Sequence, residues 1–266
     1  MIKLGVNTVL FQKFDLATAM THIAWAGYDG IEISAIKGMC EHLDLDRWQE
    51  QTNEIHDLAA QHNLELLSTE VASLDETRLQ TAFDACAAIG IPVVNVGPGG
   101  KSDIQEDLDH AINHLAKMAE LAAQRGVTLC VKAHVNASIY STPTTLAAME
   151  RIANPAFGID MDPSHIYRAG ELPEEALPQV ISRVRHIHIR DCKGRGPSPG
   201  APCNQACGRG DVNLYGYFEA MVKGGYSGPV NLEVIGAGDY ELGQRTVIAA
   251  ESYGYMNACL KHLGAR

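Results

Sequence analysis

The sequence predicts an α/β protein that folds as a single (β/α)8 TIM barrel over residues 1–266. Eight short β-rich runs alternate with eight longer amphipathic stretches, a pattern typical of βα units around a parallel sheet. Dividing the chain by eight gives about 33 residues per unit, close to the expected βα repeat. A doubly wound open sheet is the alternative. The first strand, however, lacks the Gly-rich phosphate turn that usually accompanies that fold.

The expected strands are short runs rich in apolar and β-branched residues, and several expected helices begin at Asp, Ser or Thr, which can cap a helix. The strands are expected at residues 2–7, 30–35, 64–69, 92–97, 128–134, 157–162, 185–190 and 229–235. The helices are expected at residues 15–26, 44–62, 75–89, 103–125, 143–153, 174–182, 214–223 and 240–263. Residues 191–213 are rich in Gly and Pro, which predicts a long loop over the barrel mouth that acts as a lid.

Composition excludes several classes of protein. The chain is 46% apolar and 20% charged, which is typical of a globular protein. Its formal charge of 21 − 32 = −11 disfavours nucleic-acid binding. No apolar run reaches the roughly 18 residues of a membrane span, and the N-terminal residues lack a signal peptide's apolar core, so we expect a cytoplasmic protein without a membrane partner. The seven cysteines are scattered, which favours reduced thiols over a disulfide framework.

Polar residues stand at the carboxyl ends of three neighbouring expected strands. Asp162, His188 and Glu233 each fall on the face that the alternation of the strand turns inward. Any one of them alone is read more readily as a satisfied polar residue in an ordinary network. Together, two carboxylates and an imidazole at one rim predict a site for a divalent ion such as Mn2+, Mg2+, Co2+ or Zn2+.

Several motifs carry a family resemblance. The segments "FGIDMDPSH", "RHIHIRD", "GRGDVN" and "YSGPVNLEV", in this order, resemble the second half of xylose isomerase-like barrels, the sugar phosphate isomerase and epimerase superfamily. The segment "AGYDGIEIS" resembles the second strand of that family, so the resemblance spans essentially the whole chain. It implies four metal ligands: a Glu that ends strand five, and the residues matching Asp162, His188 and Glu233. Lys132 stands where the family has that Glu.

Lys132 leaves three interpretations open. A bound ion would lower the pKa of Lys132, so that the neutral amine acts as a base. Alternatively, its positive charge partly replaces the ion, pairs with Asp162 and Glu233, and polarises a substrate oxygen. In the third interpretation the ion keeps three ligands, and His134 or Glu70 approaches as the fourth. We favour the third, because catalytic metal sites often keep an open position.

The resemblance also implies further site residues. His165 matches a histidine of the family that contacts the substrate, although a loop-packing imidazole is an alternative. Arginines suit an anionic group because the guanidinium fork matches carboxylate and phosphate, although most loop arginines are solvated. The predicted substrate contacts are Glu32, Glu70, His134, Arg190 and Arg209.

The resemblance implies a metal-dependent sugar isomerase or epimerase that acts on a ketose or keto-sugar through an enediolate. Glu233 would remove the proton, and Lys132 or His165 would return one through water. The alternative is a lyase, either a keto-sugar or inosose dehydratase or a 3-keto-glycoside or C-glycoside lyase, with Lys132 as the general acid. A second alternative is a catalytically inert sugar-binding relative. We expect a homodimer or homotetramer. The C-terminal helix is apolar enough to form the interface or, equally, to cover the barrel.

Overall fold

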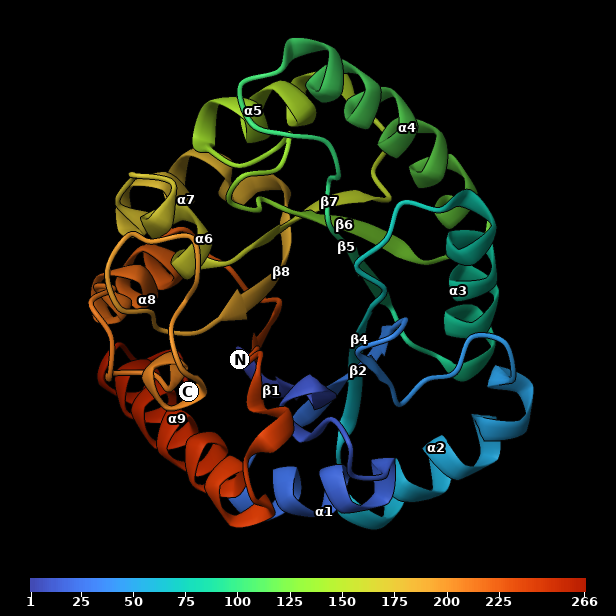
Figure 1. The fold of residues 1–266 in the computed structure, drawn as a ribbon, viewed down its shortest axis with the longest axis vertical. Coiled ribbons are helices and arrows are strands. Elements are labelled where there is room, and N and C mark those ends of the chain that lie inside the picture. The colour runs from blue at the N-terminus through green and yellow to red at the C-terminus, as the bar shows by residue number, and fades with distance from the viewer.

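Eight parallel strands close into a barrel that is ringed by helices (Figure 1) in the structure, a computed structural model that describes residues 1–266. The strands follow the order β1-β9-β8-β7-β6-β5-β4-β2, and pairing of β1 with β2 closes the ring. A short strand, β3 (Cys40–Glu41), pairs antiparallel with the end of β2. The predicted TIM barrel is therefore confirmed.

Each expected strand corresponds to one strand of the barrel. Their bounds are β1 (Lys3–Asn7), β2 (Gly30–Ile36), β4 (Glu65–Glu70), β5 (Val93–Val96), β6 (Thr128–Lys132), β7 (Phe157–Met161), β8 (Val184–Ile189) and β9 (Pro229–Leu232). β6 and β9 end two or three residues before the expected bounds. His134 and Glu233 therefore lie just beyond their strands, in the loops at the carboxyl end of the barrel.

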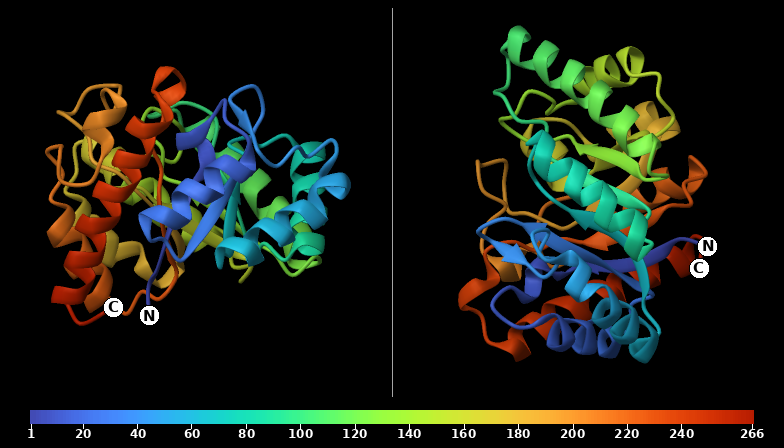
Figure 2. Two further views of the ribbon diagram at one scale, coloured as in Figure 1. Left: turned by 90° about the horizontal axis from the view of Figure 1, so that it is seen from below. Right: turned by 90° about the vertical axis from the view of Figure 1, so that its right-hand side faces the viewer.

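The eight expected helices are also present. They are α1 (Leu16–Ala26), α2 (Trp48–His62), α3 (Glu76–Ile89), α4 (Gln105–Ala123), α5 (Thr142–Arg151), α7 (Pro173–Val180), α8 (Leu214–Lys223) and α9 (Leu242–His262). Short 3-10 helices cover Thr8–Phe11, Ile181–Arg183, Pro202–Gln205 and Ala237–Asp239. The two termini lie side by side (Figure 2), and Arg266 Nη1 donates to the Ile2 carbonyl at 3.3 Å. No helix combines the length and the hydropathy needed to cross a bilayer.

One helix was not expected. α6 (Pro163–Arg168) begins directly after β7, because the Asp162 carboxylate accepts a hydrogen bond from the Ser164 N–H at 2.8 Å and Pro163 occupies the first helical position. Both residues are strong signals for a helix start. With only six residues, α6 is too short to show a helical period in the sequence.

The inside and the outside of the barrel differ in polarity. The outer faces of the strands pack against the helices in one cluster of buried apolar residues. The barrel interior contains a buried polar set instead: Asn7, Glu32, Ser68, Glu70, Asn95, Lys132, Asp160, His186, His188 and Asn231. Buried polar groups are tolerated where they bond to one another, so the interior is a hydrogen-bonded network rather than an apolar core.

Gly5 of β1 makes room for this network. A Cβ added at Gly5 would lie 1.9 Å from Asn231 Oδ1 and 2.7 Å from a methyl carbon of Leu67. The Asn231 amide donates to Ser68 Oγ at 3.0 Å, and its nitrogen lies 2.7 Å from His186 Nε2. The absence of a side chain at Gly5 therefore allows Asn231 to reach the middle of the barrel.

We expect Gly5→Ala to lower the free energy of unfolding by about 1–3 kcal/mol, the usual cost of overpacking a filled core. Chemical denaturation measures the change. Gly243→Ala is the matched control, because a Cβ at this exposed position of α9 meets nothing within 4 Å. Equal stability of Gly5→Ala and the wild type would show that Asn231 does not depend on the space left by Gly5.

Candidate active site at the carboxyl end of the barrel

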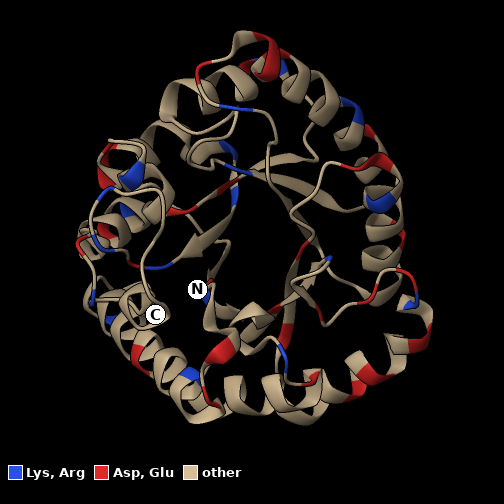
Figure 3. Cartoon of the chain, in the orientation of Figure 1, with Lys and Arg blue, Asp and Glu red and all other residues tan.

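A cavity of about 420 Å³ opens at the carboxyl ends of the strands, where TIM-barrel enzymes place their active sites. Its polar wall includes Glu70, Lys132, His134, Asn136, His165, Arg168, Arg190 and Glu233, and its apolar wall includes Ile36, Met39, Pro98, Pro197, Pro199 and Ile235. Most charged residues of the chain lie on the outer helices, but a smaller group of both signs lies on the strands and strand ends of the barrel (Figure 3). The cavity therefore has charged residues at its bottom and apolar residues at its rim.

Lys132 lies between two carboxylates at the base of the cavity. It is the last residue of β6, and its Nζ lies 2.8 Å from Glu70 Oε1, at the end of β4, and 2.8 Å from Glu233 Oε1, just after β9. All three residues are at most 4% exposed. A buried charge is stable only where it is paired, and the Lys132 ammonium provides this pairing for two carboxylates at once.

Arg190 pairs with Glu233 from the other side. Its Nη1 lies 3.1 Å from Glu233 Oε2, its Nη2 lies 2.9 Å from Asp162 Oδ2, and its Nε donates to Ser164 Oγ at 2.9 Å. The two carboxylate oxygens accept no hydrogen bond of good geometry, so these contacts are mainly attractions between charges. Each oxygen of Glu233 thus faces a different cation.

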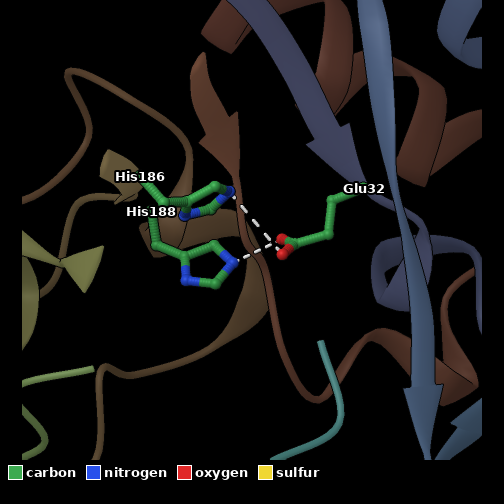
Figure 4. Close-up of side chains that lie close together, drawn as sticks. All are labelled: Glu32, His186 and His188. Carbon is green, nitrogen blue, oxygen red and sulfur yellow. Dashed lines mark hydrogen bonds and ion pairs between the residues drawn. The ribbon is translucent and has the colours of Figure 1, made fainter. Parts of the chain in front are cut away.

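His188 forms the floor beneath this cluster. Its Nδ1 lies 2.6 Å from Asp160 Oδ2, and its Nε2 contacts the Glu32 carboxylate. Figure 4 shows the rings of His186 and His188 side by side, both directed at Glu32. Asn95 also donates to Glu32 Oε1, at 2.5 Å. Both ring nitrogens of His188 are therefore engaged by carboxylates.

The buried charges shift the pKa values of this cluster. Burial lowers the pKa of His188, but Asp160 and Glu32 outweigh burial and raise this pKa well above its usual value. Burial raises the pKa of Glu233, yet the charges of Lys132 and Arg190 hold it well below its usual range. Glu70 differs, because burial and the neighbouring Glu233 charge raise its pKa to about 8.

These shifts separate the two carboxylates beside Lys132. The pKa of Glu70 therefore lies above that of Glu233, so Glu70 is the first of the two to take up a proton. Burial lowers the pKa of Lys132, but the charges of Glu233 and Glu70 outweigh it, and the pKa rises above its usual value. Two carboxyl groups whose pKa values are pushed apart are the arrangement that supplies one general base and one general acid.

His165 brings a neutral imidazole to the cavity. Burial and the charge of Arg190 hold its pKa well below the usual value. Its Nδ1 lies 2.9 Å from Arg168 Nη2 and 3.3 Å from the Val135 N–H, and its Nε2 lies 2.7 Å from Arg190 Nη2, so donors approach both ring nitrogens. The ring centroid of His134 lies 4.0 Å from that of His165, so two histidines form one side of the cavity.

Three of these buried groups are consistent with a divalent metal site. The ligand atoms of Glu70, His188 and Glu233 all lie within 4.8 Å of one another, and carboxylate and imidazole are ordinary ligands of such ions. The Lys132 ammonium, however, stands 2.8 Å from two of these carboxylates. An ion and the ammonium would therefore compete for the same oxygens.

The structure brings most of the predicted site residues together. Glu70, Lys132, His134, His165, Arg190 and Glu233 line the cavity, and Asp162, Glu32 and His188 lie directly behind this lining. Asp162 contacts Arg190 and does not join the Glu70, His188 and Glu233 cluster. Arg168 lines the cavity too. It was missed because it lies on α6, one helical turn after His165, and α6 itself was not expected.

Arg209 is the predicted substrate contact that the structure places elsewhere. Its Nε donates to Glu251 Oε1 of α9 at 2.6 Å, and it does not line the cavity. The physical reason lies in the loop. Asp191 accepts hydrogen bonds from the N–H groups of Gly208 and Val212, both at 3.1 Å, and this anchor turns the segment between them toward α9.

The model of the xylose isomerase-like TIM barrel family matches residues 21–259. The chain belongs to this family. An uncharacterized family relative from Methanocaldococcus jannaschii is 23% identical over 249 residues, which cover 87% of this chain and 83% of that protein. An inosose dehydratase from Clostridium botulinum is 23% identical over 196 residues, 66% of this chain and 63% of the dehydratase. The chain therefore spans less than two thirds of that dehydratase.

Solved structures share the xylose isomerase-like barrel. A D-allulose 3-epimerase from Methylomonas sp., in complex with D-allulose, has a TM-score of 0.76 at 17% identity, with 97% of this chain and 96% of that chain covered. The IOLI protein, with a bound zinc atom, has a TM-score of 0.78 at 17% identity, with 98% and 99% covered. At this identity the likeness shows the fold. The neighbours in structure thus include sugar epimerases, whereas the relatives in sequence include dehydratases.

We expect Asp160→Asn to destabilise the fold, because Asp160 pairs with the Nδ1 atoms of both His186 and His188. Removing one partner from a buried ionic group costs about 3–5 kcal/mol. Asp239→Asn is the same chemical change at an exposed pair with Lys13, where solvent screens the charges and a much smaller loss is expected. Urea unfolding of the two variants measures the difference. Equal losses would show that the buried network does not stabilise the barrel.

Proposed function

We propose that this chain is a sugar isomerase or epimerase that moves a proton on the carbon next to the carbonyl group of a ketose or keto-sugar. The observation that carries the proposal is the pair of buried carboxyl groups, Glu70 and Glu233, which both contact Lys132 at the base of one cavity. A cavity of about 420 Å³ also suits a small molecule. The similarity to a D-allulose 3-epimerase structure supports this substrate class.

In this proposal Glu233 is the general base. It is ionised, and its Oε2 accepts no hydrogen bond, so a lone pair remains for a substrate proton. The proton passes from carbon to Glu233, and the electron pair of the C–H bond forms the enediolate. For epimerisation, Glu70 then gives its proton to the opposite face of the same carbon. For isomerisation, Glu70 gives its proton to the neighbouring carbon, and the hydroxyl proton moves from one enediolate oxygen to the other. The atoms of the substrate are conserved, as isomerisation and epimerisation require.

Other residues around the cavity would position the sugar. His134, His165 and Arg190 present ring nitrogens and a guanidinium to hydroxyl groups. The loop of residues 191–213 would close over the substrate as a lid, because Pro197 and Pro199 line the cavity and the Pro197 carbonyl accepts a hydrogen bond from Arg168 at 2.8 Å.

A keto-sugar or inosose dehydratase is the second candidate. It would begin with the same proton removal by Glu233 and end with loss of water instead of return of the proton to carbon. The leaving hydroxyl group needs a proton donor, and both Glu70 and the Lys132 ammonium can provide one. The sequence similarity to an inosose dehydratase favours this candidate.

A screen of ketoses, keto-sugars and inososes in D2O tests both candidates. We expect the wild type to introduce deuterium next to the carbonyl of its substrate, with unchanged product mass apart from the isotope. We expect Glu233→Gln to lower kcat by about 10²–10⁴-fold, the usual contribution of a general base. NMR and mass spectrometry measure both effects, and loss of one water identifies the dehydratase.

The control for this experiment is Glu251→Gln, the same change at the pair with Arg209 outside the cavity. It should retain wild-type turnover. Wild-type turnover by Glu233→Gln would remove Glu233 as the base and, with it, this proposal.

A further inference from the structure

We propose that the Lys132 ammonium, together with the Arg190 guanidinium, occupies the place of a divalent ion in this barrel, so that the site works without a metal. The part of the proposal that concerns catalysis rests on the proposed function above. The part that concerns exclusion of metal ions rests only on the geometry of the buried cluster.

The first step is the position of Lys132. Its Nζ lies 2.8 Å from Glu70 Oε1 and 2.8 Å from Glu233 Oε1, two of the three groups in the Glu70, His188 and Glu233 cluster. A bound ion would lie about 2.0–2.6 Å from the same oxygens. Both cations would then lie between the same two carboxylates, where their repulsion is strong. Only one of them can be present.

The second step concerns Asp162 and His188, the other residues that could bind an ion at this site. Asp162 accepts the Ser164 N–H with one oxygen and faces Arg190 with the other. His188 has a carboxylate at each ring nitrogen, Asp160 at Nδ1 and Glu32 at Nε2. A metal-bound histidine needs one nitrogen free of hydrogen for the ion. Both nitrogens of His188 therefore already have carboxylate partners, and the remaining Asp162 oxygen faces Arg190 through an attraction between charges.

The third step is charge. Lys132 stands where relatives are expected to have a glutamate, and the change from −1 to +1 adds two units of positive charge. A divalent ion adds the same two units. A site with Lys132 and no ion therefore carries the same formal charge as a site with the glutamate and an ion. With both Lys132 and an ion, the site would carry two further positive charges in a buried volume.

The fourth step is what the ammonium can do for a substrate. A lysine has three N–H donors, and Glu70 and Glu233 take two of them. Lys132 also lines the cavity, so the third donor is available to a substrate oxygen. A donor aimed at an enediolate oxygen stabilises the negative charge that forms there, which is the role that an ion would otherwise have.

Metal uptake tests this proposal without any substrate. Wild-type protein and Lys132→Glu are incubated with Mn2+, Co2+ or Zn2+, freed of unbound ion by gel filtration, and analysed by mass spectrometry for metal. We expect less than about 0.1 ion per chain for the wild type and about one ion per chain for Lys132→Glu, because the new carboxylate completes a ligand set. The melting temperature should rise with added metal in Lys132→Glu alone.

Lys261→Glu is the matched control, because it makes the same change in charge at an exposed position of α9 and should bind no more metal than the wild type. One tightly held ion per wild-type chain would overturn the proposal. Folded Lys132→Glu protein that takes up no ion would also overturn it, since position 132 would then not be the place of the ion.

If Lys132→Glu does not fold, the measurements on the wild-type protein alone still test the proposal. Metal uptake or a rise in melting temperature with metal refutes the proposal, and the absence of both supports it. Where the screen for turnover succeeds, we expect activity to be unchanged by a chelator. Failure of that screen would count against the proposed function and leave the result on metal exclusion intact.

Discussion

Charge pairing inside the barrel is the constraint on which the rest of the site depends. Several carboxylates lie within the strand layers, where an unpaired charge costs several kcal/mol. Glu233 meets this constraint with two cations, Lys132 on one oxygen and Arg190 on the other. The same pairing lowers the pKa of Glu233, so the interaction that makes its burial possible also keeps it in the form that a general base needs.

The strand layers extend this pairing downward from the cavity. Asp160 holds His186 and His188 through their Nδ1 atoms, and Glu32 receives the opposite side of both rings. A shift of one of these side chains therefore affects the side chains of the next layer, because the two layers share carboxylates. Such a network is rigid when all members are satisfied, and rigidity at the base of a cavity keeps reacting groups in place.

The period of the sequence was enough to predict the barrel, because strands and helices of this length leave a clear alternation of polarity. It also placed Lys132, His188 and Glu233 on inward faces, since side chains alternate strictly along a strand. It could not predict the partner of each long side chain. One of the three interpretations of Lys132 pairs it with Asp162 and Glu233, whereas in the structure it pairs with Glu70 and Glu233, and Arg190 reaches Asp162.

The destination of a Lys or Arg head group depends on distances across the barrel, and these distances are absent from a one-dimensional pattern. The same limit explains Arg209. Its sequence context resembles a loop at the substrate, but the hydrogen bonds of Asp191 turn it toward α9. A short helix such as α6 is not revealed by the hydrophobic period of the sequence for a different reason. Its six residues make fewer than two helical turns.

A cation on a side chain differs from a bound ion in one respect that bears on the function. The occupancy of a metal site depends on the concentration of the ion and on its affinity. Lys132 is instead a covalent part of β6 and is present in every copy of the protein. Tethering also limits the cation to one position and to three directed donors, so it can polarise fewer substrate oxygens than an ion with several open positions. A site built on Lys132 would therefore gain independence from metal supply and accept a narrower set of substrate geometries.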